Sequence, residues 1–234
     1  QGRTLFGGLV AANVASAMTK LVEPDLQLRT LSLVMAGPIN PGTAQIQTTL
    51  DRTGSATAFT AATVSQAGSV RTRAQAVFAR TRDSAIEVIP QMGALDNTFD
   101  ESPLLPYLEG IVPVCMQHFE IRWGLGDFPF SGSQRTSLGG YCRHQEPASG
   151  IEAILGLLDC WPPAILPMGA GPAAASTVSW TAHILREPPA DPTAWYSFRY
   201  DTIAAEQGYA TIVGTLSHDG DVVAWTEQLV AVYA

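Results

Sequence analysis

Residues 6–22 read FGGLVAANVASAMTKLV, and this stretch decides how the rest of the chain can fold. It is rich in alanine, almost free of charge, and ends before Glu23-Pro24. The pattern predicts a helix over residues 6–22 that is buried on most sides, because it has little polar surface to turn toward water. A helix of this kind needs other elements wrapped around it.

Four strand-like segments follow the predicted helix. Each is rich in residues that favour strands, such as valine and threonine, with rough alternation of apolar and polar positions. Turns that contain glycine or proline separate them, for example at Gly37-Pro38 and Ala67-Gly68. Such short connections predict an antiparallel sheet built from residues 27–36, 43–51, 56–66 and 69–79.

Residues 83–113 lose this rhythm and carry four prolines and a small acidic cluster. We interpret them as a linker between an N-terminal half (residues 1–82) and a C-terminal half (residues 114–234). The linker is long for an ordinary loop, so we expect part of it to pack on a surface. In the C-terminal half the pattern predicts a helix over residues 149–160 and strands over residues 114–123, 137–143, 176–185, 195–205, 209–217 and 222–233.

The order of elements repeats between the halves, with a period of roughly 145 residues. A helix, a long strand, a proline-rich turn, two strands, a tight turn and a final strand occur twice. This repetition predicts a duplicated α+β domain with two antiparallel sheets, each wrapped around a central helix. That arrangement is a double hot-dog, whose sheets would join side by side across a pseudo-twofold axis. The alternative is a single α+β domain whose halves look alike by chance.

Composition and charge narrow the class of protein. The 234-residue chain is 46% apolar and 15% charged, which is typical of a folded globular protein rather than a disordered one. Its formal net charge of −8 disfavours partners such as nucleic acid and anionic membranes. We find no apolar run of 18 residues and therefore expect no membrane span.

The three cysteines have no close spacing, and no histidine has the context of a metal ligand. We therefore expect neither a disulfide framework nor a metal site, and no other cofactor. Free cysteines favour a reducing, cytoplasmic location. The chain opens with Gln1 rather than Met, which leaves open that a first strand precedes it.

Three polar side chains stand out against the apolar pattern. Asp159 follows an apolar run near the end of the second predicted helix, where the helix dipole disfavours an acid. Thr177 begins a predicted strand, and Gln228 lies within the last one. Taken alone, each has a structural explanation: an exposed acid, an ordinary strand threonine and an outward-facing glutamine.

Together these three side chains predict a site that holds one water molecule. Asp159 would accept its proton or hold it by a hydrogen bond, while Thr177 and Gln228 fix its position. Such a site polarises water against an ester or thioester carbonyl without a covalent intermediate. The oxyanion needs backbone N–H donors, which a helix N-terminus supplies, and Gly7 and Gly8 would let a ligand approach that backbone closely.

The segments TLFGGLVAANVASAM, GLLDCWPPAIL, STVSWTAHIL and GDVVAWTEQLVAV resemble the TesB-like acyl-CoA thioesterases, also called thioesterase II. The resemblance spans nearly the whole chain in element order. Proteins of this family are double hot-dogs, and the FGG motif that opens their first helix is matched by residues 6–8. The resemblance implies that Asp159 is the catalytic aspartate and that Thr177 and Gln228 are its partners.

The chain departs from the family in the strand that carries Thr177. Better-known members have an Asp-His pair shortly after the threonine, whereas this chain has Ser179 and Trp180. We expect Trp180 to narrow or reshape the tunnel that would hold the acyl chain. Four arginines between residues 71 and 82 either face the phosphates of coenzyme A or form a solvated strand face.

The resemblance implies hydrolysis of a fatty acyl-CoA thioester to free acid and coenzyme A, in lipid metabolism. Only the second predicted helix carries a carboxylate, so we expect one active site per chain, near the interface of the halves. A homo-oligomer of double hot-dogs is compatible with this reading. Two rivals stay open, a non-catalytic acyl-CoA-binding module and, with less support, a hot-dog enoyl-CoA hydratase or dehydratase, since the fold alone does not choose among them.

Overall fold

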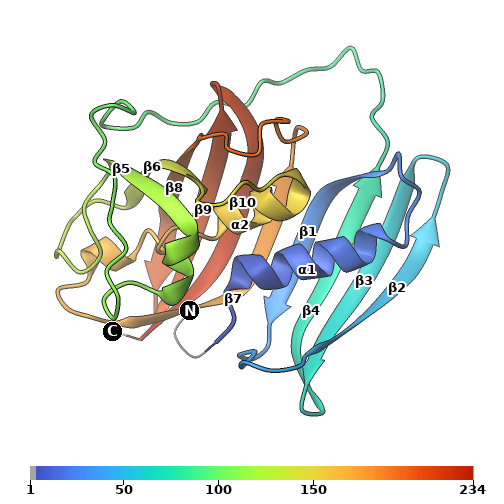
Figure 1. Cartoon of the computed structure of the whole chain (residues 1–234), viewed down its shortest axis with the longest axis horizontal. Coiled ribbons are helices and arrows are strands. Elements are labelled where there is room, and N and C mark those ends of the chain that lie inside the picture. The colour runs from blue at the N-terminus through green and yellow to red at the C-terminus, as the bar shows by residue number, and fades with distance from the viewer. Residues whose placement is uncertain (1–3, 234) are drawn as a thin grey trace.

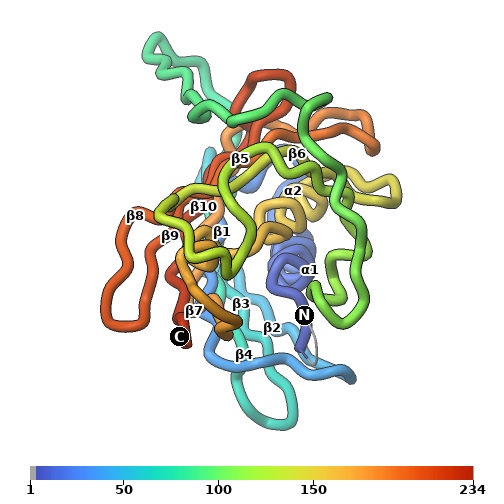
Figure 2. Tube along the Cα trace, turned by 90° about the vertical axis from the view of Figure 1, so that its left-hand side faces the viewer, coloured from blue at the N-terminus to red at the C-terminus, as the bar shows by residue number. Residues whose placement is uncertain are grey.

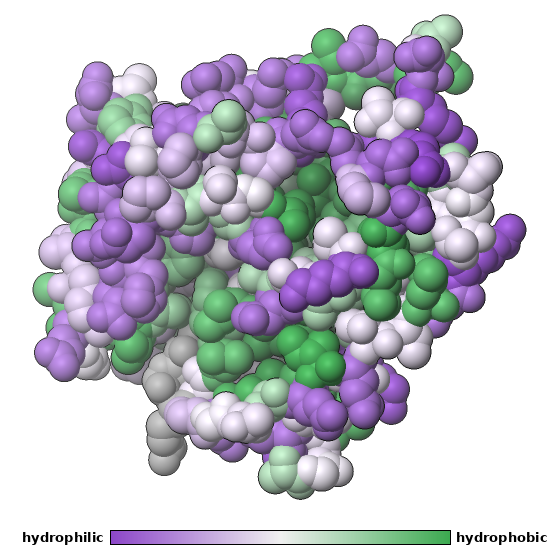
Figure 3. All heavy atoms as spheres, turned by 45° about the vertical axis from the view of Figure 1, so that its right-hand side comes forward, coloured by the Kyte–Doolittle hydropathy of each residue, from purple (hydrophilic) through white to green (hydrophobic). Residues whose placement is uncertain are grey.

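The apolar helix that opens the chain is present and packs against the sheet of the first half (Figure 1). The computed structural model describes residues 4–233. Helix α1 (Gly7–Thr19) is shorter at both ends than predicted and buries seven of its 13 residues. Leu9 and Asn13 remain exposed, and Figure 3 shows apolar side chains gathered on the side of the molecule where α1 lies.

Four antiparallel strands form the sheet of the first half, and their bounds lie within two residues of the prediction. Several alanines lie on the face of this sheet that shares a core with α1, among them Ala62, Ala74 and Ala76. Small side chains on both elements let the helix lie close to the strands. The strands, in the spatial order β2-β3-β4-β1, are β1 (Gln27–Met35), β2 (Gln45–Thr53), β3 (Thr57–Gln66) and β4 (Ser69–Ala79).

The second half repeats this plan around helix α2 (Gly150–Leu158) and adds two strands before it. Its strands, in the spatial order β7-β10-β9-β8-β6-β5, are β5 (Phe119–Leu125), β6 (Ser137–His144), β7 (Ala174–Ile184), β8 (Tyr196–Glu206), β9 (Tyr209–His218) and β10 (Asp221–Tyr233). A short 3₁₀ helix, η2 (Leu166–Met168), precedes β7.

The prediction of a strand over residues 114–123 is wrong in its first half. Residues Val114–His118 form a 3₁₀ helix, η1, and β5 begins only at Phe119. The register explains the difference, because Phe119 pairs with His144, the last residue of β6. Residues before Phe119 therefore have no partner strand opposite them, and the chain turns instead.

The two halves join edge to edge into one sheet of ten strands (Figures 1 and 2). Strands β1 and β7 pair antiparallel at the centre, with Leu33 opposite Trp180 and Val34 opposite Ser179. Both helices lie on the same side of this sheet, which we call the inner face. The predicted double hot-dog is confirmed, with its two sheets continuous across β1 and β7.

A β-bulge in β7 changes which residues of this strand face inward. Along β10, Leu229 pairs with Ser179 and the next residue, Val230, pairs with Thr177, so Val178 is left without a partner. Residues that pair across an antiparallel ladder point to the same face. Since Val230 is fully buried, the bulge turns Thr177 to the inner face, while Ser179 points to the outer one together with the exposed Val34.

The segment after β4 packs along β5, as expected for part of the linker. The Leu105 N–H donates to the carbonyl of Ile121 at 2.8 Å, and Leu104 forms an isolated bridge with Arg122. The division at residues 82 and 114 stays a prediction. In the part of the chain that the structure describes, neither α1 nor α2 is long and apolar enough to cross a bilayer.

Candidate active site

A pocket of about 440 Å³ lies where α1 begins and α2 ends. The first half contributes Gly7 at the start of α1 and Met35 at the end of β1, and the second half contributes Asp159 and Thr177. Much of the remaining lining is apolar, including Ile39. The pocket therefore combines apolar side chains with polar groups that come from both halves.

Asp159 is the cap residue at the C-terminus of α2, and its carboxylate faces the N-terminus of α1. The backbone N–H of Gly8 donates to Asp159 Oδ2 at 2.7 Å. The dipole of α2 disfavours an acid at this position, but the dipole of α1 favours it, because the two helix ends meet here. The fold thus compensates the unfavourable placement that the sequence pattern showed.

Gln228 connects the other polar groups of the site. Its Nε2 donates to Asp159 Oδ1 at 3.1 Å and to the hydroxyl of Tyr200 at 3.0 Å. Thr177 donates its hydroxyl hydrogen to Gln228 Oε1 at 2.9 Å. Both hydrogens of the Gln228 amide group are therefore used within the protein, and Gln228 itself is only 4% exposed.

The surroundings of Asp159 change its protonation. Burial raises the pKa of Asp159 to about 6, against the opposing effect of the hydrogen bonds from Gln228 and Gly8, which favour the ionised form. Asp159 nonetheless lines the pocket, because this residue is only partly buried. A carboxylate with a pKa near 6 is ionised at neutral pH and is still basic enough to take a proton.

The two glycines at the start of α1 are required by close contacts. A Cβ atom on Gly7 would lie 2.7 Å from Asp159 Oδ2, and one on Gly8 would lie 2.6 Å from the Phe6 ring. Both distances are shorter than any normal van der Waals contact. Glycine at residue 7 lets the carboxylate approach the helix, and glycine at residue 8 lets Phe6 fold back over it.

Trp180 lies apart from the pocket, although it is directly opposite Gln228 in the sheet. It is 1% exposed, and its indole N–H donates to the hydroxyl of Thr226. The pocket lining does not include it. A contact between Trp180 and substrate stays a prediction.

Sequence reasoning missed Tyr200, the fourth member of the network. Its hydroxyl accepts from Gln228 and donates to the carbonyl of Leu158 at 2.8 Å. No local signal marks this tyrosine, because it lies in a strand rich in aromatic residues, Tyr196, Phe198 and Tyr200, that all face inward. Only the packing of β8 beneath the end of α2 distinguishes it from its neighbours.

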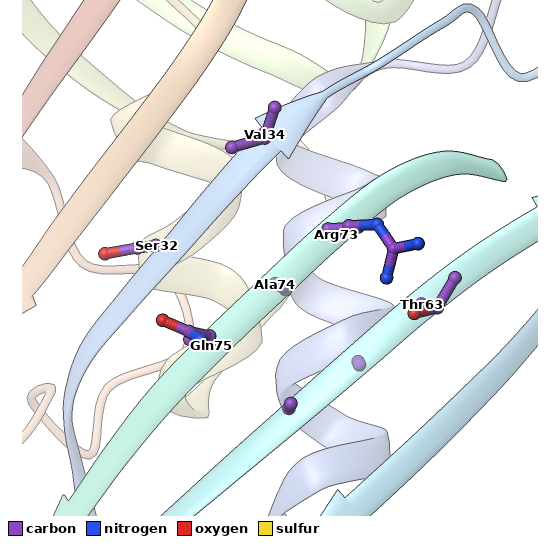
Figure 4. Close-up of a pocket in the computed structure, with 8 residues that line it drawn as sticks. Ser32, Val34, Thr63, Arg73, Ala74 and Gln75 are labelled. Carbon is purple, nitrogen blue, oxygen red and sulfur yellow. The ribbon is translucent and has the colours of Figure 1, made fainter.

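A second pocket, of about 360 Å³, lies on the outer face of the first half (Figure 4). Arg73 lies there beside Val34 and Thr63, on the side of the sheet away from the helices. Its eight described lining residues include no carboxylate and no histidine. Arg73 is therefore on the opposite face from Asp159, which favours the interpretation of this arginine as part of a solvated strand face.

The fold and the site together define a double hot-dog protein with a carboxylate-lined pocket between its halves. Family models agree: the acyl-CoA thioesterase N-terminal domain matches residues 1–79, and the C-terminal domain matches residues 90–232. The chain therefore belongs to the acyl-CoA thioesterase family and is a thioester hydrolase. No curated protein sequence matches it significantly.

Solved structures repeat the fold over nearly the whole chain. A hot-dog protein of unknown function from Alicyclobacillus acidocaldarius is 24% identical, with a TM-score of 0.87 over 100% of this chain and 89% of that one. A putative thioesterase II from Thermobifida fusca YX is 19% identical, with a TM-score of 0.79 over 99% and 88%. The acyl-CoA thioesterase II TesB2 from Mycobacterium marinum is 17% identical, with a TM-score of 0.81 over 97% and 89%. With the family models, they confirm the resemblance to TesB-like thioesterases.

Proposed function

We propose that this chain hydrolyses fatty acyl-CoA thioesters by direct attack of a water molecule that Asp159 and Thr177 hold. The observation that carries the proposal is the bond network around Gln228. This one buried amide binds both the carboxylate and the hydroxyl, and both of these groups also line the same pocket.

The hydrogen bonds leave a defined place for the water. Among the described residues, one protein donor reaches each oxygen of the Asp159 carboxylate, which leaves each oxygen able to accept from another donor. Thr177 has donated its only hydrogen to Gln228, so its oxygen is left to accept. A water that donates one hydrogen to Asp159 and one to Thr177 keeps a lone pair free for the thioester carbonyl.

In the first step, Asp159 takes a proton from this water as the water oxygen attacks the carbonyl carbon. The resulting tetrahedral intermediate carries a negative charge on the former carbonyl oxygen. We assign its stabilisation to the first turn of α1, where Gly7 lines the pocket and the helix dipole favours an anion. Collapse of the intermediate expels the coenzyme A thiolate, and the proton held by Asp159 neutralises it.

The pocket also supports this choice over a covalent mechanism. Its described lining residues include neither a cysteine nor a histidine, the usual members of a nucleophile–base pair. Its apolar residues, among them Leu5, Val10 and Ile39, suit the hydrocarbon part of an acyl chain.

A thioesterase assay with the purified chain and acyl-CoAs of graded length tests the proposal. Wild type should release coenzyme A thiol, and Asp159→Asn should lose about 10²–10⁴-fold in kcat, the usual contribution of a general base. Gln228→Ala should also be impaired. If both variants hydrolyse as fast as wild type, the site assignment is wrong. Binding by calorimetry without any turnover would instead select the non-catalytic acyl-CoA-binding module.

A further inference from the structure

The carbonyl of Leu158, the last residue of α2, lacks the backbone donor that a longer helix would supply. In a longer helix this oxygen would accept from the backbone N–H four residues later, but that residue is Pro162, which has none. The Tyr200 hydroxyl donates to it at 2.8 Å instead. Tyr200 is 2% exposed, so water does not substitute for it at this position.

This bond determines what the Tyr200 oxygen can do next. A carbonyl oxygen only accepts, so the single phenolic hydrogen is used on Leu158 and the Tyr200 oxygen is left as an acceptor. The group of Gln228 that faces it, at 3.0 Å, must therefore be the donating Nε2. Burial raises the pKa of Tyr200 well above its ordinary value, so the hydroxyl keeps its proton.

The orientation of the Gln228 amide sets the direction of every bond in the site. With Nε2 toward Tyr200, the second amide hydrogen points to Asp159 and Oε1 points to Thr177. Thr177 must then donate its hydroxyl hydrogen to Gln228, which leaves the Thr177 oxygen free to accept. A flipped amide would bring Oε1 against the Asp159 carboxylate, and the two oxygens would repel each other.

We propose that Tyr200 is a positioning residue of this hydrolase: it holds the Gln228 amide in one of its two orientations and so sets the hydrogen bonds of Asp159 and Thr177. This inference rests on the proposed function. It deepens that function by extending the water site to a side chain on β8 that does not line the pocket. The chain of bonds ends at a carbonyl that Pro162 leaves without a backbone partner.

Tyr200→Phe removes the hydroxyl and keeps the ring, and Tyr196→Phe is its matched control on the same strand and the same face. We expect Tyr200→Phe to lower kcat about 10-fold, the change in rate that one lost hydrogen bond makes, with little change in KM. Tyr196→Phe should keep the kcat of wild type.

The acid limb of the pH profile of kcat separates positioning from a merely structural role. In Tyr200→Phe the Gln228 amide is free to flip, which would bring Oε1 against Asp159 and disfavour the ionised carboxylate. The acid limb of kcat should therefore move to higher pH. Among the described residues, the titratable groups whose pKa the Asp159 charge raises are Cys115, Cys160 and Tyr200. Burial raises the pKa of each above its ordinary value, so all three stay neutral while Asp159 titrates.

A second variant covers the case in which Tyr200→Phe does not fold. Replacement of Tyr200 by 4-aminophenylalanine keeps a donor for the Leu158 carbonyl, but the amine is a poor acceptor and also donates toward Gln228. The flipped amide is then favoured, and we expect the same loss in kcat and a shift of the acid limb at least as large.

The kinetics of these variants decide the proposal. A lower kcat with a raised acid limb in the Tyr200 variants supports it. Wild-type kcat, or a lower kcat with the acid limb unmoved in both variants, overturns it. Asp159→Asn is measured in the same assay: if that variant keeps the wild-type rate, the proposed function fails, whereas an inactive Asp159→Asn beside wild-type-like Tyr200 variants rejects the role of Tyr200 alone.

Discussion

The two central helices begin alike and end differently. The first residue of each helix is a glycine, Gly7 in α1 and Gly150 in α2. The cap residue at the C-terminus is Lys20 in α1 and Asp159 in α2. A cation suits the negative end of a helix dipole and an anion does not, so α1 ends as an ordinary helix and α2 ends against its own dipole.

This difference indicates that the duplicated unit is used asymmetrically. The carboxylate that α2 places unfavourably accepts a hydrogen bond from the first turn of α1, where the dipole favours it. The second half thus supplies the acid and its polar partners, and the first half supplies a helix N-terminus and apolar walls. One strong consequence is that changes in the second half should affect the chemistry more than changes in the first.

After Asp159 itself, the largest effect should come from Thr177 in the second half. We expect Thr177→Val to lower kcat about 10-fold to 100-fold, because the water loses one of the two groups that orient it. The matched control is Thr181→Val on the same strand, since Thr181 lies on the outer face and its hydroxyl is 3.1 Å from that of Ser32. Steady-state hydrolysis rates of both variants check this, and equal losses in the two would count against the water site.

A second test uses the pH at which the acid of α2 ionises. Since the ionised Asp159 is the active form and its pKa is raised to about 6, kcat at pH 5 should be about 10-fold below its plateau above pH 7. Stability depends on pH in the opposite direction to kcat. The carboxyl titrates higher in the folded chain than in the unfolded one, so its contribution to folding is present at low pH and is lost as the pH rises through about 6. A plateau that extended down to pH 4.5 would exclude Asp159 as the base.

The two helix-start glycines should fail in different ways. Gly7→Ala places a methyl group 2.7 Å from the Asp159 carboxylate, so kcat should fall about 3-fold to 10-fold while the melting temperature holds. A Cβ atom on residue 150 would contact no backbone atom, but Gly150 has a φ of +79°. Gly150→Ala should therefore lose about 1 kcal/mol of stability and keep kcat. Thermal melts and kinetics on both variants would detect the crossed pattern, and the reverse pattern would contradict the asymmetry.

The smallest effect is expected at Lys20. Lys20→Asp gives α1 the acidic cap of α2, but the substitution adds no partner equivalent to Gln228 or Thr177. We expect unchanged hydrolysis and a loss of about 0.3–1 kcal/mol from the unfavourable helix dipole. Chemical denaturation beside the kinetic assay measures both, and a gain in activity would mean that the first half can host a second site.

Much of the fold could be predicted from local patterns. Alanine-rich residues 6–22 indicated a buried helix, and the alternation in the strands indicated antiparallel sheets with bounds close to those observed in the first half. These features depend on neighbours only a few residues apart, and so they are readable from the sequence. The prediction of a strand over residues 114–123 is wrong before Phe119, because a strand needs a partner and β6 ends opposite Phe119.

The site was predicted only as a set of residues. Asp159, Thr177 and Gln228 were identifiable as polar exceptions and by resemblance to a family, but simple alternation would place Thr177 on the same face as Ser179 and Thr181. The bulge at Val178 moves Thr177 to the other face, and a bulge is set by pairing with β10, some fifty residues away in the chain.

By itself, the sequence determined the apolar helices, the strand pattern, the order of elements and the acid that precedes Pro162. Only the tertiary structure decided that β1 and β7 form the junction of the shared sheet, that Thr177 faces inward, and that the Tyr200 hydroxyl lies against Gln228. The physical reason is distance along the chain. The bond from Gly8 to Asp159 joins residues 151 positions apart, and no local pattern carries information about a contact that forms when two helix ends meet.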